Sequence, residues 1–290
     1  MTSTQGPSDP TSPAKREGDP ASSAPMITTR MILALALPSL GALIAEPLFT
    51  VIDSTMVGHL GTPQLAGLGI ASTVLNTAVG LFIFLAYSTT SLAGRHLGAG
   101  RRDLAIRSGV EAMWLAGGLG ALAAILLAVF ASPLLTWLGA DAATMPHALA
   151  YLRASAPGLV GMFVVLAATG TLRGLQDTRT PLIAASVGAA FNAVANWVLM
   201  YPLDLGVAGS GLGTAITQTL MAAFLGWMIV RAARREGVSL RPSTDGLFGA
   251  ALEGAPLLVR TLALRAALLA TLSAVTAIST QALAAHQIVW

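Results

Sequence analysis

The sequence predicts an all-α, polytopic integral membrane protein, and three observations lead to this fold class. The 290 residues are 54% hydrophobic and only 10% charged, whereas soluble domains carry about a quarter of their residues as charged side chains. Apolar runs of about 20 residues, the length needed to cross a bilayer, recur along the chain. The few charges fall in the short segments between these runs. A membrane-embedded helical protein is therefore expected.

Residues 1–25 precede the apolar runs and are expected to form a disordered cytoplasmic tail. They are rich in Pro, Ser, Thr and Gly and contain no apolar stretch, so they can form neither a packed core nor the core of a signal peptide. An eighth span is expected to begin near Leu283, after seven full spans. These are 31–57, 65–94, 108–131, 148–172, 181–201, 207–230 and 251–276.

The basic residues orient these spans. With a cytoplasmic tail, 13 of the 16 Lys and Arg residues fall in cytoplasmic segments, and the others, Arg153, Arg260 and Arg265, lie within or at the ends of spans. Membrane proteins keep an excess of Lys and Arg on the cytoplasmic side. We therefore expect a multi-pass protein of the cell (inner) membrane with a cytoplasmic N-terminus. This placement explains the net charge of +3 without nucleic-acid binding.

An ungapped internal repeat relates residues 31–70 to residues 249–288, and it pairs Pro38 with Pro256. The chain makes an even number of crossings between the two copies, so both enter the membrane from the same side. Parallel repeats of this kind build transporters from two lobes, with the substrate site near the midplane between them. The expected organisation is an N-terminal six-helix lobe at 26–235, an inter-lobe cytoplasmic loop at 236–250 and the beginning of a C-terminal lobe at 251–290.

Several motifs follow one another along the chain. The first span and the loop after it carry LALPSLGALIAEPLFTVIDSTMVGHLGTPQLAGLGIA. The second span is followed by GRHLGAGRRDLA, and the fifth is preceded by GTLRGLQDTRTP. The sixth span begins with GVAGSGLGTAIT and the eighth with ALAAHQI. In this order the motifs resemble the multidrug and toxic compound extrusion (MATE) family, in its DinF-like branch, over about residues 27–290. The resemblance implies a two-lobe, twelve-helix transporter, C-terminally truncated here, with a complete six-helix N-terminal lobe and only the start of the second lobe.

Asp53 is the candidate coupling carboxylate. It lies in an apolar part of the first span, deep between Ile52 and Met56, where a charged and unpaired carboxylate costs several kcal/mol. Such a position favours a group that takes up and releases a proton. The resemblance places Asp53 at the family's coupling aspartate. The alternative interpretation is an aspartate near the outer end of the span that reaches water and only caps the structure.

Two further residues of the first span are candidates. Pro38 removes a helical hydrogen bond and should kink the span; in the family a bend at this proline is coupled to protonation of the aspartate, and a static kink is the alternative. Glu46 lies seven residues before Asp53, nearly on the same helical face. It is either a relay or substrate-contacting carboxylate or a structural residue. Asp53 has Thr271 as its counterpart in the second copy, so coupling is expected in the N-terminal lobe.

Polar residues of the fifth and sixth spans are the expected partners of Asp53. Asn192 and Asn196 are one helical turn apart in a span without charges, so both amides should face protein or water. The resemblance adds Thr214 to this cation-coupling group. Part of the family has an aspartate where Asn196 stands, which favours a single-carboxylate proton site over a bound metal cation. Ordinary interhelical hydrogen bonding is the alternative.

The remaining candidates belong to a substrate cavity or to packing. Gln218, one turn beyond Thr214, and Arg265, within the seventh span, join Glu46 as candidate cavity residues. The glycines at 206, 209, 211 and 213 begin an apolar span without Walker residues. They are therefore expected to permit close helix packing and not to bind phosphate.

The expected function is secondary active efflux of cationic or amphipathic organic compounds, coupled to inward H⁺ or Na⁺ movement through Asp53. The sequence has no cysteine and no HExxH or GxSxG motif, so an antiporter without cofactor or resident metal is expected, not an enzyme. Its partners are the bilayer and a small organic substrate, not nucleic acid. The missing C-terminal lobe is expected to be required for activity. A flippase of similar fold for lipid-linked intermediates and a truncated inactive fragment are the alternatives.

Overall fold

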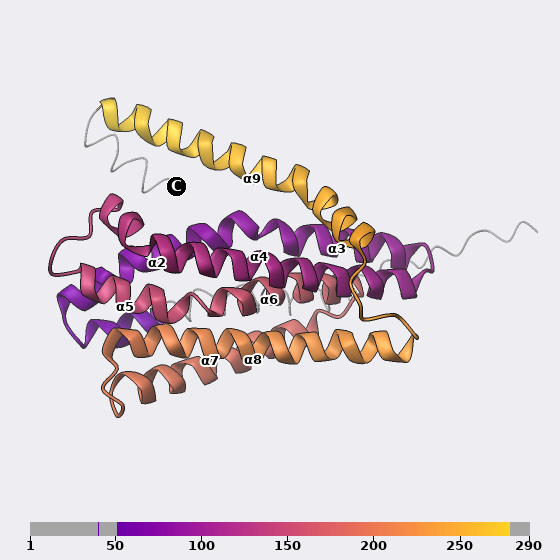
Figure 1. Cartoon of the computed structure of the whole chain (residues 1–290), viewed down its shortest axis with the longest axis horizontal. Helices are drawn as coiled ribbons and strands as arrows, with labels where there is room; N and C mark the ends of the chain where they lie inside the picture. Colours follow the sequence, from indigo (N-terminus) through magenta and orange to yellow (C-terminus); the bar gives the residue numbers. More distant parts are fainter. Residues whose placement is uncertain (1–39, 41–50, 279–290) are drawn as a thin grey trace, which may run out of the picture.

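The computed structural model describes residue 40 and residues 51–278, and this part of the chain is helical throughout, without a strand (Figure 1). A short helical stretch, residues 51–58, leads into the bundle. The helices that follow are α2 (Thr62–Phe82), α3 (Phe84–Gly98), α4 (Arg102–Trp137), α5 (Met145–Ser155), α6 (Gly158–Gly174), α7 (Arg179–Met200), α8 (Gly206–Arg235) and α9 (Thr244–Ile278). The predicted all-α class is confirmed.

The outer surface of the bundle is apolar, as a membrane protein requires. Five helical stretches in the described part are long and apolar enough to cross a bilayer, or six when the bent pair α5 and α6 is taken as one span. Ile125 and Val129 of α4 and Val187 and Val194 of α7 are between 62% and 66% exposed. Apolar patches of this extent mark a surface covered by something other than water. The chain is a multi-pass membrane protein; the first expected span lies largely outside the described residues.

Two of the expected spans are interrupted. The span expected at 148–172 is split into α5 and α6, which meet at an angle of 52°. Pro157 lies in the break. Because proline has no N–H and its ring clashes with the preceding turn, the backbone hydrogen bonds of the helix cannot continue without interruption there. The span expected at 65–94 corresponds to α2 and α3, which are separated only by Ile83 and still count as one membrane-long stretch.

Two buried clusters hold α2 to α8 together. Phe163 and Leu159 of α6 are fully buried in the first cluster, where α6 packs mainly on α3 and α4. Ile106 of α4 and Leu225 and Ile229 of α8 form the second, where α6 and α8 meet α4. Helix α6 therefore lies near the centre of the bundle. Helix α7 packs mainly on α8 and only slightly on α6.

Glycines allow α8 to approach its neighbours at backbone distance. A Cβ on Gly161 of α6 would lie 2.7 Å from the main-chain carbon of Gln218, and one on Gly209 of α8 would lie 2.7 Å from that of Leu199 in α7. A Cβ on Gly211 would lie 2.6 Å from the carbonyl oxygen of Tyr151 in α5. The predicted role in close helix packing is confirmed for the glycines at 209, 211 and 213 and is wrong for Gly206, which has nothing within 4 Å of its Cβ position and instead adopts a φ of +53°.

The segment between α8 and α9 is fastened to the start of α4. Glu111 of α4 accepts hydrogen bonds from Arg107 Nε at 2.8 Å and from Ser243 Oγ at 2.9 Å. Arg107 also donates from Nη1 to the carbonyl oxygen of Ser239 at 2.8 Å. Glu111 is buried and Arg107 is half-buried, so water competes little for these contacts. Helix α9 begins at Thr244, inside the segment expected to be a loop at 236–250.

Helix α9 lies on the flank of the bundle. It contacts α3 and α4 most and α2 only slightly, and Figure 1 shows its far end diverging from the other helices. Most of its described side chains are exposed. The face that α9 presents away from α3 and α4 is therefore not covered by the described part of the chain.

Asp141 organises the turn between α4 and α5. Its Oδ1 accepts hydrogen bonds from the Thr144 hydroxyl and the Thr144 N–H, both at 2.8 Å, and from the Ala143 N–H at 3.1 Å. The Thr144 hydroxyl is the main cause that lowers the pKa of Asp141 below its usual 3.8. A lowered pKa means that the carboxylate stabilises the folded turn above the unfolded pKa, and that this contribution is lost as pH falls through the folded value.

We therefore expect the turn at Asp141 to be held at neutral pH and to loosen in acid below about pH 4. Amide hydrogen exchange at Ala143 and Thr144, measured in the unmodified chain and in Asp141→Asn at each pH, checks this. The unmodified chain should exchange more slowly at neutral pH, and the two should converge in acid. Equal rates at neutral pH would show that the carboxylate does not hold the turn.

Candidate functional site

The candidate site lies where residues 51–58, α7 and α8 meet, close to one end of the bundle. Asn196 is four residues before the end of α7 at Met200, and Ser210 is four residues after the start of α8 at Gly206. Both are therefore about 6 Å from a helix end. Asp53 is only 5% exposed. Asp53 therefore lies toward one end of α7 and α8 and not midway along them, and its side chain is enclosed by protein.

Asp53 is held by neutral hydrogen-bond donors from two helices. Asn196 Nδ2 donates to Asp53 Oδ1 at 2.9 Å, and the Ser210 hydroxyl donates to the same oxygen. Asn192 and Asn196 exchange hydrogen bonds between their amides at 3.0 and 3.3 Å. Bonds to a charged acceptor are about twice as strong as neutral ones, so Asp53 joins residues 51–58 to α7 and α8 most firmly when it is ionised.

A second polar group borders this one. The phenol of Tyr151 in α5 lies beside the hydroxyls of Thr214 and Ser72, within range of the charge on Asp53. Tyr151 and Thr214 are buried. The Thr214 hydroxyl oxygen has no well-formed hydrogen bond to any described residue. The Tyr151 phenol is therefore the nearest described polar group to this buried hydroxyl.

The two oxygens of Asp53 are not equivalent. Both donors bind Oδ1, and no described residue donates to Oδ2. Within the described part of the chain, no cation forms an ion pair with this carboxylate. The described residues therefore hold only one of the two carboxylate oxygens.

The absence of a side chain at Gly213 of α8 makes room for the side chain of Asn196 in α7. A Cβ on Gly213 would overlap Asn196 Oδ1, so only glycine leaves the space in which this amide turns toward Asp53. The sequence interpretation assigned Gly213 to packing alone. The structure shows that this packing also sets the position of a site residue.

Sequence reasoning missed two members of the site. Ser210 precedes Thr214 by four residues and therefore shares its face of α8, a signal that could have identified it. Tyr151 is on a different helix, with no spacing to connect it to Asp53. Of the predicted cation-coupling residues, the structure brings Asp53, Asn192 and Asn196 into one hydrogen-bonded group and places Thr214 next to it, beside Tyr151.

The other candidates lie elsewhere. Pro38 and Glu46 are outside the described residues. Gln218 is half-buried, with its main chain packed on Gly161 of α6. Arg265 is exposed on α9, and its guanidinium reaches Gly80 of α2. Neither residue contacts the Asp53 group.

The second repeat lacks an equivalent carboxylate. Thr271, the counterpart of Asp53, is exposed on α9 and donates to the carbonyl oxygen of Ala267 at 2.9 Å. Pro256, the counterpart of Pro38, lies inside α9. Most of the first copy of the repeat is outside the described residues, so the repeat itself stays a prediction.

An apolar bundle that gathers polar groups around one buried carboxylate is typical of a membrane transporter. The sequence profile described as MatE matches residues 38–198, more than half of the chain. The chain therefore belongs to the MatE family. Relatives carry names such as Multidrug resistance protein MdtK, and the family is one of transporters, not of enzymes.

Named relatives occur in plants and bacteria. The chain is 32% identical to Protein DETOXIFICATION 44, chloroplastic, of Arabidopsis thaliana, across 68% of this chain and 40% of the relative. It is 32% identical to DNA damage-inducible protein F of Escherichia coli strain K12, across 71% and 45%, and 26% identical to Multidrug resistance protein MdtK of Klebsiella pneumoniae strain 342, across 71% and 46%. The chain spans about half the length of these relatives.

Solved structures share the fold. A MATE crystal structure in the bent conformation has a TM-score of 0.78 at 23% identity, covering 88% of this chain and 58% of that one. A MOP superfamily transporter from Pyrococcus furiosus has a TM-score of 0.76 at 24% identity, covering 89% and 58%.

Proposed function

We propose that this chain supplies the cation-coupling lobe of a two-lobe antiporter that exports cationic or amphipathic organic compounds across the cell membrane. The observation that carries the proposal is the buried carboxylate of Asp53, whose hydrogen bonds from the described residues all reach Oδ1 and come from neutral donors of α7 and α8. Relatives named for multidrug resistance support the substrate class. The distribution of Lys and Arg supports a cytoplasmic N-terminus in the inner membrane.

Protonation of Asp53 is the step that couples ion and substrate movement. The site is near the end of the bundle that the charge distribution assigns to the outside, so a proton reaches Oδ2 over a short distance. A neutral carboxyl accepts weaker hydrogen bonds than a carboxylate, and the bonds from Asn196 and Ser210 weaken together. Residues 51–58 are then released to shift against α7 and α8, which favours departure of the compound to the outside.

The donor set favours H⁺ over Na⁺ as the coupling ion. The group contains one carboxylate, two amides and the hydroxyls of Ser210 and Thr214, and Asn196 presents an amide nitrogen to Asp53. Asn196 thus contributes no second charged oxygen to a cation. The second lobe is required to complete alternating access, because the substrate site of such transporters is between the lobes.

Everted membrane vesicles that contain the complete two-lobe transporter test this proposal. With an imposed pH gradient and no Na⁺, addition of ethidium or tetraphenylphosphonium should discharge the gradient. Discharge only after Na⁺ is added would make Na⁺ the coupling ion, and no discharge in either medium would contradict the antiporter function. Transport by the 290-residue chain alone in proteoliposomes would contradict the requirement for a second lobe.

A further inference from the structure

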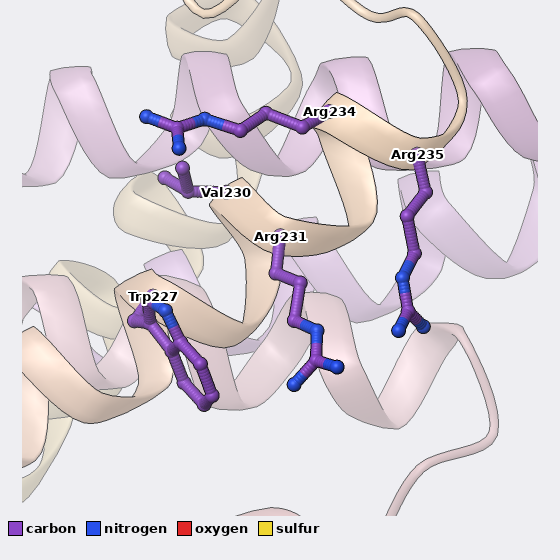
Figure 2. A pocket seen from close by; sticks show the side chains of 5 residues that line it. All are labelled: Trp227, Val230, Arg231, Arg234 and Arg235. Carbon is purple, nitrogen blue, oxygen red and sulfur yellow. The ribbon is translucent and has the colours of Figure 1, made fainter.

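The C-terminal end of α8 carries a basic pocket far from Asp53. The pocket has a volume of about 370 Å³ and is lined by Trp227, Val230, Arg231, Arg234 and Arg235. Figure 2 shows the side chains of Trp227, Arg231 and Arg235 extending to one side of the helix, whereas Arg234 extends to another. Their spacing of four residues places these three on one stripe.

The aromatic ring and the first arginine of this stripe are already in contact. The guanidinium carbon of Arg231 lies 5.4 Å from the centre of the Trp227 ring, within cation–π range. Trp227 is 52% exposed, and Arg231 and Arg235 are exposed as well. The stripe therefore offers an apolar ring and two guanidinium groups to whatever lies beside α8.

The positive charge of this pocket is not neutralised by the described part of the chain. The ion pairs of the described residues involve Arg95, Arg102 and Arg107, and none of these pairs involves an arginine of α8. Glu236 is adjacent to Arg235 in sequence, but its carboxylate binds Arg102 Nε at 3.2 Å. Arg231 and Arg235 are therefore free of ion pairs with the described residues and available to an anionic partner.

Helix length places the stripe at the depth of lipid headgroups. The 30 residues of α8 span about 45 Å, whereas the hydrocarbon core of a bilayer is about 30 Å thick. With Gly206 at one surface, the core ends near Trp227, and Arg231 and Arg235 project into the headgroup layer. Tryptophan is enriched at this boundary, and Arg-rich pockets on the cytoplasmic side bind anionic headgroups.

We propose that this pocket binds the headgroup of an anionic phospholipid of the cytoplasmic leaflet, with its phosphate between Arg231 and Arg235 and its glycerol region against Trp227. A guanidinium pair one turn apart matches the phosphate oxygens, and the neighbouring ring and Val230 suit the upper acyl chains. A free phosphate ion would use only the arginines. The inference rests on the proposed orientation of the chain and not on transport.

Quenching of Trp227 fluorescence by brominated lipids tests the site directly. The 290-residue chain is placed in phosphatidylcholine nanodiscs that contain a small share of brominated phosphatidylglycerol or of brominated phosphatidylcholine. Subtraction of the signal from Trp227→Phe isolates Trp227 from the other tryptophans. We expect an affinity for phosphatidylglycerol on the order of tenfold above that for phosphatidylcholine, because two basic side chains bind the anionic headgroup.

Two double variants separate a built pocket from general surface charge. Arg231→Gln with Arg235→Gln should abolish the preference. Arg101→Gln with Arg179→Gln removes two exposed arginines at the starts of α4 and α7 and should leave it unchanged. Equal quenching by both lipids in the unmodified chain, or an equal loss in both double variants, would overturn the proposal. Asp53→Asn should not alter the quenching, so failure of coupling and failure of lipid binding are distinguishable.

Discussion

Asp53→Asn is expected to reduce proton-coupled efflux by the complete transporter to the background of vesicles without the protein. The variant removes the group that takes up and releases the proton, while the side chain keeps its size. Dye export driven by an imposed pH gradient measures the effect. Because coupling is expected only through Asp53 and its counterpart Thr271 carries no charge, no second carboxylate at the equivalent position can replace it.

The asparagine should not damage the fold, which makes this variant informative. Its amide oxygen can occupy the place of Oδ1 and accept from Asn196 and Ser210, as the carboxylate does. Bonds to a neutral amide are weaker than bonds to a carboxylate, as they are when Asp53 is protonated, so we expect only a small decrease of the thermal midpoint. Loss of efflux in a variant that still unfolds near the midpoint of the unmodified protein assigns the defect to coupling.

Asp103→Asn is the matched control. Asp103 is exposed in the first turn of α4, so the same exchange of carboxylate for amide should leave efflux unchanged. Normal export by Asp53→Asn would contradict the coupling role. Equal loss in both variants would show that the assay responds to charge on the protein and not to this site.

Gly213→Ala is expected to have the second-largest effect, on stability and efflux together. The new Cβ would overlap Asn196 Oδ1, so either α7 and α8 separate or the amide turns away from Asp53. Overpacking of this kind costs about 1–3 kcal/mol. Thermal unfolding in detergent should show a lower midpoint, and pH-driven efflux should fall because the hydrogen bond from Asn196 to Asp53 is displaced.

Gly118→Ala gives the comparison for Gly213. Gly118 is exposed in the interior of α4, and a Cβ there meets nothing within 4 Å. Alanine at such a helical position stabilises by about 0.5–1 kcal/mol. The two variants should therefore shift the midpoint in opposite directions. A midpoint for Gly213→Ala at or above that of the unmodified chain would contradict the steric role of Gly213.

Hydropathy predicted where the helices lie but not how they are interrupted. The apolar run at 148–172 continues through Pro157, so its composition reads as one span, although the proline carries the signal for the break between α5 and α6. Helix α9 begins earlier than expected because Ser243 caps it: its Oγ accepts a hydrogen bond from the Gly246 N–H at 3.1 Å. The same hydroxyl donates to Glu111, a contact between residues far apart in sequence that has no local signal.

The candidate site was predictable in part. The spacing of Asn192 and Asn196 identified a polar face of α7, but a pattern on one helix does not say which carboxylate it meets. Pairing with Asp53, 143 residues away, followed from the family resemblance and not from periodicity. Ser210 was accessible through its spacing from Thr214, whereas Tyr151 requires the three-dimensional arrangement of α5 against α8.

The contacts of the segment between α8 and α9 determine which part of α9 can move relative to the bundle. Ser243 is bonded to α4, Glu253 pairs with Arg95 of α3, and Gly254 is packed on the Phe84 ring so closely that a side chain would not fit. The first turns of α9 are therefore carried with the bundle. Two residues later, Pro256 interrupts the hydrogen bonds of the helix. Leu257 and Leu258, directly after the proline, still pack on the core of the bundle, so any independent movement of α9 is confined to turns beyond them.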